Sequence, residues 1–369
     1  MIGELPPPVN GQSKNLAAIT ADIIACPGVR LVVCSISSGR LRGGLPGHLR
    51  KTCKHLRAWA RLIACAGRSP RTLYLVADGW RGLIFTCVST ALGRALGYEL
   101  VLQHRTFAYV DRRNRLMVFV NRALGPRGRH VFLSEGMARK FFTLYQPRRR
   151  FEINHNLAQS LAFFRDLRAM PRRRPGPRLR VGLLSNLMLT KGLDVFLDLA
   201  RRSASEGLAL DFVLAGPAFG PVEEAIIRAA LAEPGISLDW RGPVHGPDRL
   251  SFFREIDIFV FPTRYRYEAQ PNVVLEAICA GVHVIAPDRG CIREDLARLG
   301  GTCMARDDEA NVSAWLEALR DVAANRVALT ARRAASLRRV RAEILGARRH
   351  YEEFLRVFSA TDPVRNAAT

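Results

Sequence analysis

The chain has 369 residues, of which 48% are hydrophobic and 24% are charged, and it carries a formal net charge of +23. This composition excludes a disordered chain, and the length exceeds one ordinary core and suits two domains. The start, Met1 to Pro6, lacks the basic and apolar regions of a secretory signal, and the best apolar stretch, 82–93, is well short of the ~20 residues that a membrane span needs.

The positive charge is concentrated in the first half of the chain. Residues 1–150 contain 25 Lys or Arg and only six Asp or Glu. A basic half indicates an anionic partner: lipid headgroups, a phosphorylated substrate or nucleic acid. Nucleic acid is not expected, because no aromatic-rich sheet motif or recognition-helix pattern stands out. We expect a cytoplasmic protein, with peripheral contact at the inner face of an anionic membrane as an alternative.

The eight cysteines are scattered along the chain. None forms a CxxC pair, and no His stands at metal-finger spacing from one. This distribution is typical of reduced, mostly buried thiols in a cytoplasmic protein. We expect no metal site and no cofactor.

In chain order, the first half alternates short β-like runs with helical patterns, as parallel α/β layers do. Strands are predicted at 30–36, 72–77, 98–103, 130–133 and 151–154. Helices are predicted at 14–25, 47–66, 81–96, 112–124 and 136–145. This alternation predicts a doubly wound sheet, with its ligand side at the carboxyl ends of the strands.

The chain opens on a Pro-rich loop that runs from Pro6 to Ser13. It is predicted to be a rigid turn that ends in Gly11 and a helix-capping Ser13. Such a loop normally follows a full strand, but only Met1 to Gly3 precede it. Either the first strand is very short, or the start of this sequence lies downstream of the true one.

The segment 48–68 is a basic amphipathic pattern. Leu49, Leu56 and Ile63 recur every seven residues, with Trp59 beside them and five Lys or Arg around them. Two interpretations stay open. The favoured one is a helix that packs on its own sheet, and the other is a helix that lies on an anionic membrane surface.

A segment rich in Pro, Gly and Arg at 171–177 cannot form a helix or a central strand and predicts a linker. Strands follow at 179–184, 210–215, 236–240, 256–261, 283–286 and 302–305. Helices follow at 192–202, 221–231, 247–254, 271–280 and 311–324, and a long basic one at 332–358. We expect one domain at 1–156, a linker at 157–178 and a second domain at 179–339.

Two carboxylates eight residues apart, Glu268 and Glu276, flank a predicted helix start at Pro271. Pro is favoured at the first helical position, so Glu268 should lie on a loop and Glu276 in the second turn. The amides of Asn272 and Val273 would favour an anion at this helix start. The pattern predicts a site for a polar, hydroxyl-rich and phosphorylated ligand.

Other loops after predicted strands add to this site. The stretch from Ser185 to Gly192 leads into a helix, and Lys191 near its amino end can face a phosphate. Gly216 ends the next strand, and 257–263 is a strand and turn just before Glu268. Dehydrogenase, P-loop and hydrolase-elbow motifs are absent.

With these motifs, residues 179–297 resemble the donor-binding half of GT-B glycosyltransferases, specifically the retaining glycosyltransferase family 4. The matching residues are Lys191-Gly192, Gly216-Pro217, Asp257 through Thr263, Glu268, Glu276, Gly281 and Gly290. In the first half, Pro6 to Gly11 resembles the family's glycine loop and Gln103 to Tyr109 its His-rich segment. The resemblance implies an α/β fold of GT-B type, with two Rossmann-like doubly wound parallel-sheet domains that face across a cleft.

The resemblance implies a glycosyltransferase that moves a sugar from a nucleotide-diphosphate sugar, bound by 179–339, to an acceptor bound by 1–156. Metal independence and retention of configuration are implied in the same way. The last helix, at about 340–360, would pack back on the first domain. Because the first half is basic, we expect the acceptor to be a lipid-linked or other anionic saccharide in surface polysaccharide biosynthesis.

The family's functional residues carry over onto matching positions. Glu268 would contact the donated sugar near the reacting carbon, His104 would line the cleft near that sugar, and Lys191 would stabilise the departing phosphate. The implied catalytic residues are thus Glu268, His104 and Lys191. Glu276 would bind ribose. The implied donor-binding residues are Gly11, Asn186, Lys191, Gly216, Glu268, Pro271, Asn272, Val273 and Glu276.

The sequence departs from the family pattern at several positions. Asn186 stands where the family usually has an Arg, so one phosphate contact is lost or comes from Arg264 or Arg266. Ala269 and Cys291 replace glycines. Two alternatives to a transferase stay open: a degenerate protein that binds nucleotide sugars without turnover, and, less favoured, a nucleic-acid-binding protein that uses the basic half.

Overall fold

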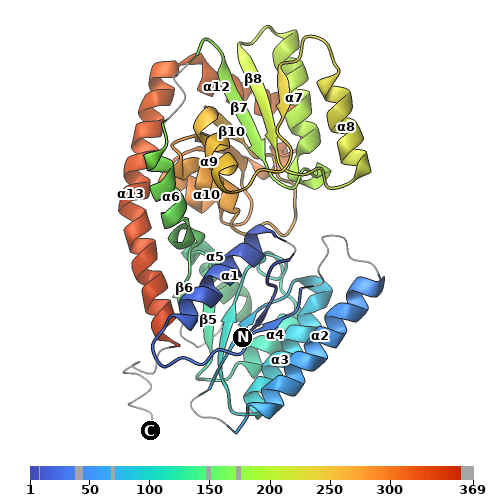
Figure 1. Ribbon diagram of the computed structural model, residues 1–369, viewed down its shortest axis with the longest axis vertical. Coiled ribbons are helices and arrows are strands. Elements are labelled where there is room, and N and C mark those ends of the chain that lie inside the picture. The colour runs from blue at the N-terminus through green and yellow to red at the C-terminus, as the bar shows by residue number, and fades with distance from the viewer. Residues whose placement is uncertain (8, 38–44, 68–70, 147–150, 172–175, 359–369) are drawn as a thin grey trace. The chain divides into compact units, whose positions relative to one another are not determined.

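The computed structural model describes residues 1–7, 9–37, 45–67, 71–146, 151–171 and 176–358, and at 45–48 only the backbone. The chain divides into two compact units. Unit 1 comprises Met1–Gln159 and Gly346–Thr369, and unit 2 comprises Ser160–Leu345. Each contains a six-stranded parallel sheet with helices packed on it (Figure 1). The predicted α/β fold with two doubly wound parallel sheets is confirmed.

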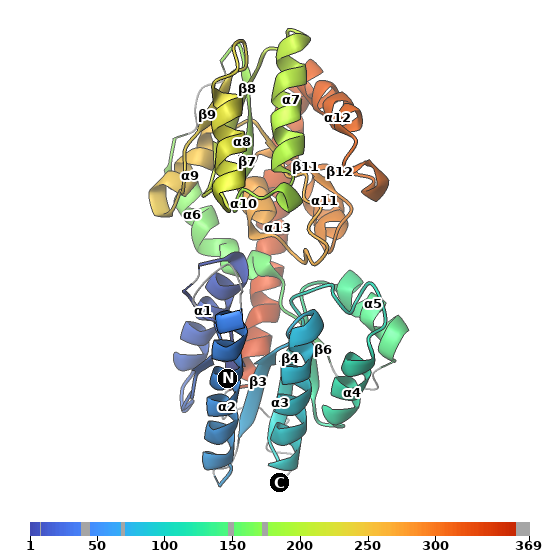
Figure 2. The ribbon, with the colours of Figure 1, turned by 90° about the vertical axis from the view of Figure 1, so that its right-hand side faces the viewer.

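Unit 1 has the strand order β2-β1-β3-β4-β5-β6. Its strands are β1 (Ile2–Gly3), β2 (Cys34–Ser35), β3 (Thr72–Val76), β4 (Glu99–Gln103), β5 (Arg129–Phe132) and β6 (Phe151–Ile153). Its helices are α1 (Gly11–Ile24), α2 (Leu45–Ala64), α3 (Leu83–Ala95), α4 (Arg115–Ala123) and α5 (Glu135–Tyr145). Helices α2, α3 and α4 lie side by side, with α3 in the middle (Figure 2).

The beginning of unit 1 differs from the prediction in two ways. Strand β1 has two residues, so β2 pairs with it only through Cys34 and Ser35 and not over the predicted 30–36. Helix α1 starts at Gly11, three residues early, because Asn10 caps it in place of Ser13. The Asn10 Oδ1 accepts from the Ser13 amide at 2.8 Å, and Ser13 Oγ accepts from the Asn10 amide at 3.0 Å.

The core of unit 1 includes the end of the long helix α13 (Arg326–Arg356). Its residues Tyr351 and Phe354 are fully buried against Leu16 of α1 and against strands β3 and β4. The Tyr351 hydroxyl donates to Asp22 on α1 at 2.7 Å. The C-terminal turns of α13 therefore complete the layer that α1 starts on one face of this sheet.

Unit 2 has the strand order β12-β11-β10-β7-β8-β9. Its strands are β7 (Leu179–Leu184), β8 (Leu210–Ala215), β9 (Leu238–Trp240), β10 (Ile258–Val260), β11 (His283–Pro287) and β12 (Thr302–Met304). Its helices are α6 (Leu161–Ala169), α7 (Leu193–Ser205), α8 (Pro221–Leu231), α9 (Gly246–Glu255), α10 (Asn272–Cys279), α11 (Ile292–Leu299), α12 (Val312–Ala324) and the first turns of α13. In chain order this is the Rossmann arrangement 3-2-1-4-5-6.

Two helices of unit 2 were not predicted. The segment 157–178, expected as a linker, contains helix α6, which buries Phe164 and Leu167. Helix α11 buries Ile292, Leu296 and Leu299, an i, i+4, i+7 pattern that the sequence displays. Both helices are short and highly charged, so their narrow apolar faces are weak signals in the sequence.

Candidate functional site

The order of the strands places a candidate site in unit 2. The sheet runs from β7 to β8 and β9 in one direction, and from β7 to β10, β11 and β12 in the other. Ligands of doubly wound sheets bind outside the carboxyl ends of the strands where the order reverses, which here is between β7 and β10. Lys191 follows β7 and Glu268 follows β10, so the two residues come from the two loops that flank this point.

Lys191 ends a short 3₁₀ turn, Leu189–Lys191, after β7. Gly192 follows it with φ of +81°, in the left-handed region that favours glycine. A Cβ at this glycine would collide with the carbonyl oxygen of Pro262, which follows β10. Gly192 therefore lets the Lys191 turn lie directly against the end of the neighbouring strand.

The side chains of Lys191 and Glu268 meet in an ion pair. Lys191 Nζ contacts Glu268 Oε2, and the Thr263 hydroxyl donates to the same oxygen at 3.1 Å. The ammonium also lies 4.7 Å from the ring centre of Tyr265. Only 19% of the Lys191 side chain and 10% of the Glu268 side chain are exposed, so this pair is a shielded part of the site.

The loop that carries Glu268 is fixed by the loop after β11. Gly290 has φ of +59°, and a Cβ there would collide with the Glu268 and Ala269 carbonyls. The Cys291 amide donates to Ala269 O at 2.7 Å, and Gln270 donates to both Asp295 oxygens at 3.0 and 3.1 Å. The buried Cys291 therefore contributes its backbone to this support.

Helix α10 begins at Asn272, with Pro271 as its N-cap, one residue later than predicted. The Pro271 side chain makes no capping hydrogen bond. Glu276 lies in the second turn, as predicted, and only 7% of the residue is exposed. Its carboxylate forms an ion pair with Arg249 of α9. The amino end of a helix is a position that favours a phosphorylated ligand.

Arg249 was missed by the sequence analysis. Its guanidinium contacts Glu276 Oε2, only 15% of its side chain is exposed, and its Nε has no hydrogen-bond partner. The two residues are 27 positions apart, so no local spacing could have joined them. The only sequence feature that could have indicated Arg249 is its positive charge in the helix predicted at 247–254, between two predicted strands.

The arginines expected to replace the missing family Arg at position 186 have other contacts. Arg264 donates to both Asp194 oxygens at 2.8 and 2.7 Å and to the Leu189 carbonyl at 2.9 Å. Arg266 lies 5.9 Å from the ring centre of Tyr267. Asn186 itself is half-buried on the loop after β7. Among the described residues near the Glu pair, Lys191 and Arg249 are the cations that contact its carboxylates.

Gly216 has a structural reason to be glycine. Its φ is +113°, and a Cβ would collide with the carbonyl oxygen of Ser185. The Gly216 amide donates to Gly242 O at 2.7 Å. The loops after β7 and β8 are thus packed backbone to backbone, and Gly216 and Asn186 lie on neighbouring loops of the same sheet edge.

The two remaining predicted residues, Gly11 and His104, belong to unit 1. Gly11 is the exposed first residue of α1. The His104 ring is fully buried: Nδ1 lies 3.0 Å from the Tyr109 hydroxyl, Nε2 lies 2.9 Å from His130 Nδ1, and the ring stacks on Phe132.

Burial, with the charge of His130 as a smaller cause, lowers the pKa of His104 well below its usual value. Both ring nitrogens have protein partners and the neutral form is favoured. Because the ring is buried and each of its nitrogens is hydrogen-bonded within unit 1, it offers no free nitrogen to a sugar.

The fold is shared with solved structures at low sequence identity. One is Alr3699/HepE from Anabaena in complex with UDP (12% identity, TM-score 0.64, 96% of this chain and 99% of that chain). Another is sucrose-phosphate synthase (tll1590) from Thermosynechococcus elongatus (13%, 0.66, 96% and 98%). A third is the apo form of the lipopolysaccharide outer core galactosyltransferase WaaB (13%, 0.55, 87% and 90%). These likenesses show a GT-B fold, as predicted.

Residues 178–325 match the model of a family described as glycosyl transferases group 1. No curated protein matches the chain. The matched range holds the whole candidate site of unit 2, from Asn186 to Glu276. The family match and the GT-B fold together support a glycosyltransferase enzyme.

Proposed function

We propose that this protein transfers a sugar from a nucleotide-diphosphate sugar, bound by unit 2, to a saccharide acceptor bound by unit 1. The observation that carries the proposal is the meeting of Lys191 and Glu268 at the reversal point of the unit 2 sheet. Glu276 lies one helical turn beyond the start of α10. Such a site offers a cation and a helix start to a diphosphate, and carboxylates to hydroxyl groups.

In the proposed mechanism, Glu276 accepts hydrogen bonds from ribose and Glu268 accepts them from the transferred sugar. The Lys191 ammonium moves from Glu268 toward the diphosphate. As the bond between sugar and phosphate breaks, negative charge grows on the departing phosphate, and Lys191 with the α10 amides stabilises it. These groups supply the positive charge without a metal ion. Membership of family 4 and retention of configuration are part of the proposal.

The proposal is tested by ligand-induced thermal stabilisation of the full chain with UDP, GDP, ADP and their sugar conjugates. UDP is the first probe, because the similar Alr3699/HepE structure contains it. A ligand at 100 times its Kd stabilises a protein by about 2.7 kcal/mol, which raises Tm by roughly 5 °C or more in a domain of this size. If none of the nucleotides raises Tm, the proposed function is wrong.

For the acceptor, we propose a lipid-linked saccharide in surface polysaccharide biosynthesis, reached by peripheral contact with an anionic membrane. Helix α2 supports this proposal. It packs on unit 1 through its buried residues His55, Ala58 and Leu62. The heptad stripe of Leu49, Leu56 and Ile63 points outward and is 67%, 54% and 56% exposed.

The surroundings of this stripe are also apolar and basic. The neighbouring helices α3 and α4 expose Ile84, Val88 and Phe119, and Trp80 just before α3 is 63% exposed. Arg50, Arg57 and Arg61 on α2 are exposed beside the stripe. Apolar side chains flanked by arginines suit the boundary between acyl chains and anionic headgroups. Among the described residues, no helix is both long and apolar enough to cross a bilayer.

Membrane contact predicts that the protein sediments with vesicles of phosphatidylglycerol and phosphatidylcholine, and much less with pure phosphatidylcholine. Replacing both Leu56 and Ile63 with Ser should weaken this binding at least about tenfold, because two buried apolar side chains are lost. The control is Val327→Ser on α13, an 81% exposed apolar residue outside the stripe, which should not change binding. Equal binding to both kinds of vesicle at physiological salt would exclude the proposed contact with an anionic membrane.

A further inference from the structure

The sheet of unit 1 has its own reversal point, and polar side chains gather there. The chain runs from β1 to β2 on one side and returns to β3 on the other side of β1, so the order reverses between β1 and β3. Glu4 directly follows β1, and Asp78 follows β3. The two residues hold the same topological position in unit 1 that Lys191 and Glu268 hold in unit 2.

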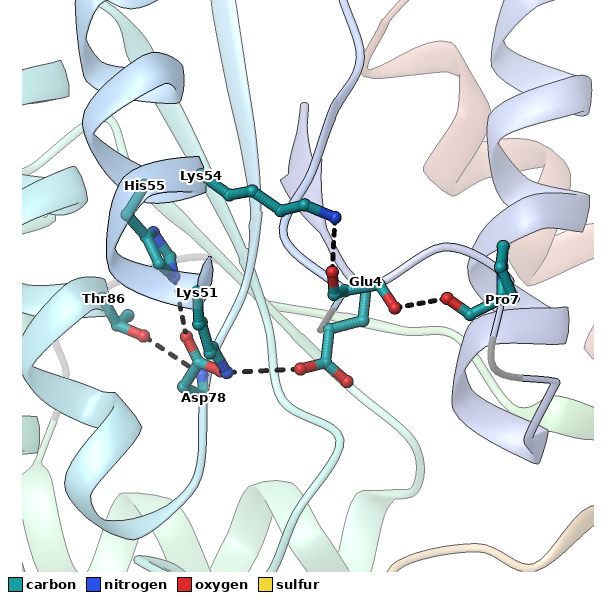
Figure 3. Close-up of polar contacts among 8 residues, drawn as sticks. Glu4, Pro7, Lys51, Lys54, His55, Asp78 and Thr86 are labelled. Carbon is teal, nitrogen blue, oxygen red and sulfur yellow. Dashed lines mark hydrogen bonds and ion pairs between the residues drawn. The ribbon is translucent and has the colours of Figure 1, made fainter. Parts of the chain in front are cut away.

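Lys51 of α2 joins the two carboxylates (Figure 3). Its Nζ lies 2.7 Å from Asp78 Oδ1 and 3.2 Å from Glu4 Oε1. The exposed fractions of the side chains are 21% for Lys51, 12% for Asp78 and 35% for Glu4. Glu4 and Lys51 are therefore the accessible residues of the cluster, and Asp78 is its buried residue.

The buried part of the cluster also contains a histidine, which takes no part in the ion pairs of Lys51. His55, also on α2, is 1% exposed and stacks on Phe85, and its Nε2 lies 4.0 Å from Asp78 Oδ2 (Figure 3). Neither ring nitrogen has a hydrogen-bond partner. A buried polar group without a partner is costly and uncommon in native proteins.

The charges of these groups limit what can bind. Burial, with the Lys51 charge as a smaller cause, lowers the pKa of His55 to about 4, so the imidazole is neutral near pH 7. Lys51 is the ammonium that contacts the two carboxylates, whereas the nearby Lys54 Nζ donates to the Ser37 carbonyl (Figure 3), and burial raises the pKa of Asp78. This balance disfavours a phosphate. It suits hydroxyl groups, which donate to carboxylates and accept from Lys51.

We propose that Glu4, Lys51, His55 and Asp78 bind the hydroxyl groups of a neutral sugar unit, the terminal saccharide of the acceptor. Because it names the acceptor, the inference rests on the proposed function. The same helix, α2, would then contact both ends of the acceptor. Its inward face would bind the sugar, and its exposed stripe would contact the membrane that holds the lipid.

The probe is a set of methyl glycosides of glucose, galactose, mannose and N-acetylglucosamine, measured on the full chain by saturation-transfer NMR without nucleotide. At least one should bind the wild type at millimolar concentration. Asp78→Asn and Glu4→Gln should each weaken that binding at least about tenfold, since each removes a charged hydrogen-bond acceptor. UDP binding in unit 2 should stay within twofold of the wild type, and an unchanged near-UV circular dichroism spectrum and Tm report that unit 1 of each variant is folded.

The matched control is Glu152→Gln, another carboxylate of unit 1, paired with Arg129 at 3.3 Å on the opposite edge of the sheet. It should leave glycoside binding unchanged. The inference is overturned if no glycoside binds the wild type, or if both cluster variants bind as the wild type does. Failure of the proposed function has a different signature, the absence of any nucleotide effect.

Discussion

Replacing Glu276 with Gln is expected to weaken UDP binding about 100-fold. The carboxylate is proposed to accept two ribose hydrogen bonds, and hydrogen bonds to a charged group contribute about 1.5–3 kcal/mol each. The Gln side chain keeps the shape of Glu276 and leaves Arg249 an oxygen to contact. Isothermal titration of the full chain with UDP and with uridine measures the effect, and both ligands should weaken alike because both carry the ribose.

The control for this variant is Glu309→Gln. Glu309 pairs with Arg289 in the same unit, and the side chains are 11% and 12% exposed, close to the 10% and 15% of Glu276 and Arg249. If both variants reduced UDP affinity equally, the loss would report general damage to unit 2. Unchanged UDP affinity in the Glu276 variant would disprove the ribose role.

Arg249 can be tested in the same titrations. In Arg249→Gln, a loss that is equal for uridine and UDP would show that the guanidinium only orients Glu276. A larger loss for UDP than for uridine would show that Arg249 contacts the diphosphate. Arg249 would then take the place of the Arg that the family usually has at position 186.

Replacing Lys191 with Met is expected to lower kcat about 1000-fold, because the departing phosphate loses its nearest cation, a contribution of about 4 kcal/mol. The measurement is release of UDP from the UDP-sugar that stabilises the wild type, which needs no acceptor. The loss in kcat should exceed the loss in UDP affinity, since charge on the phosphate grows in the transition state.

Two further variants separate the roles around Lys191. Glu268→Gln should lower kcat while UDP affinity stays within about twofold, because UDP lacks the sugar that Glu268 is proposed to contact. Arg264→Met is the cation control, and it should cost less than tenfold because Arg264 is held by Asp194. A Lys191 variant that keeps more than a tenth of the wild-type kcat would contradict the mechanism.

The candidate site of unit 2 could be predicted largely from local patterns. Lys191 follows a buried strand, Pro271 precedes a helix and Glu276 lies in its second turn, and these positions in the chain fix their positions at one sheet edge. The local backbone conformation also explains why two positions are glycine, since φ values of +81° at Gly192 and +113° at Gly216 disfavour residues with a side chain. The sequence placed the Pro271 helix start within one residue.

The contacts of these residues could not be predicted in the same way. Arg249 and Glu276 meet across 27 positions, and the pairing of Arg264 with Asp194 spans 70. The contacts of His104 with His130 and Phe132 likewise depend on how strands β4 and β5 pair. Such partners depend on which side chains the sheet brings together, and no local period encodes that.

The sequence by itself determined the α/β class, the two sheets, the Glu268 and Glu276 pair and the basic first half, because periodicity, turn residues and charge are local properties. Only the tertiary structure decided which faces stay exposed and which charges meet. The sequence left open whether the segment 48–68 packs on its own sheet or lies on a membrane, and in the structure α2 packs on unit 1 through His55 and Leu62 while Leu56 of the heptad stripe is exposed. Lys51 thereby reaches Glu4 and Asp78 across 47 and 27 residues, a meeting that the order of the strands brings about.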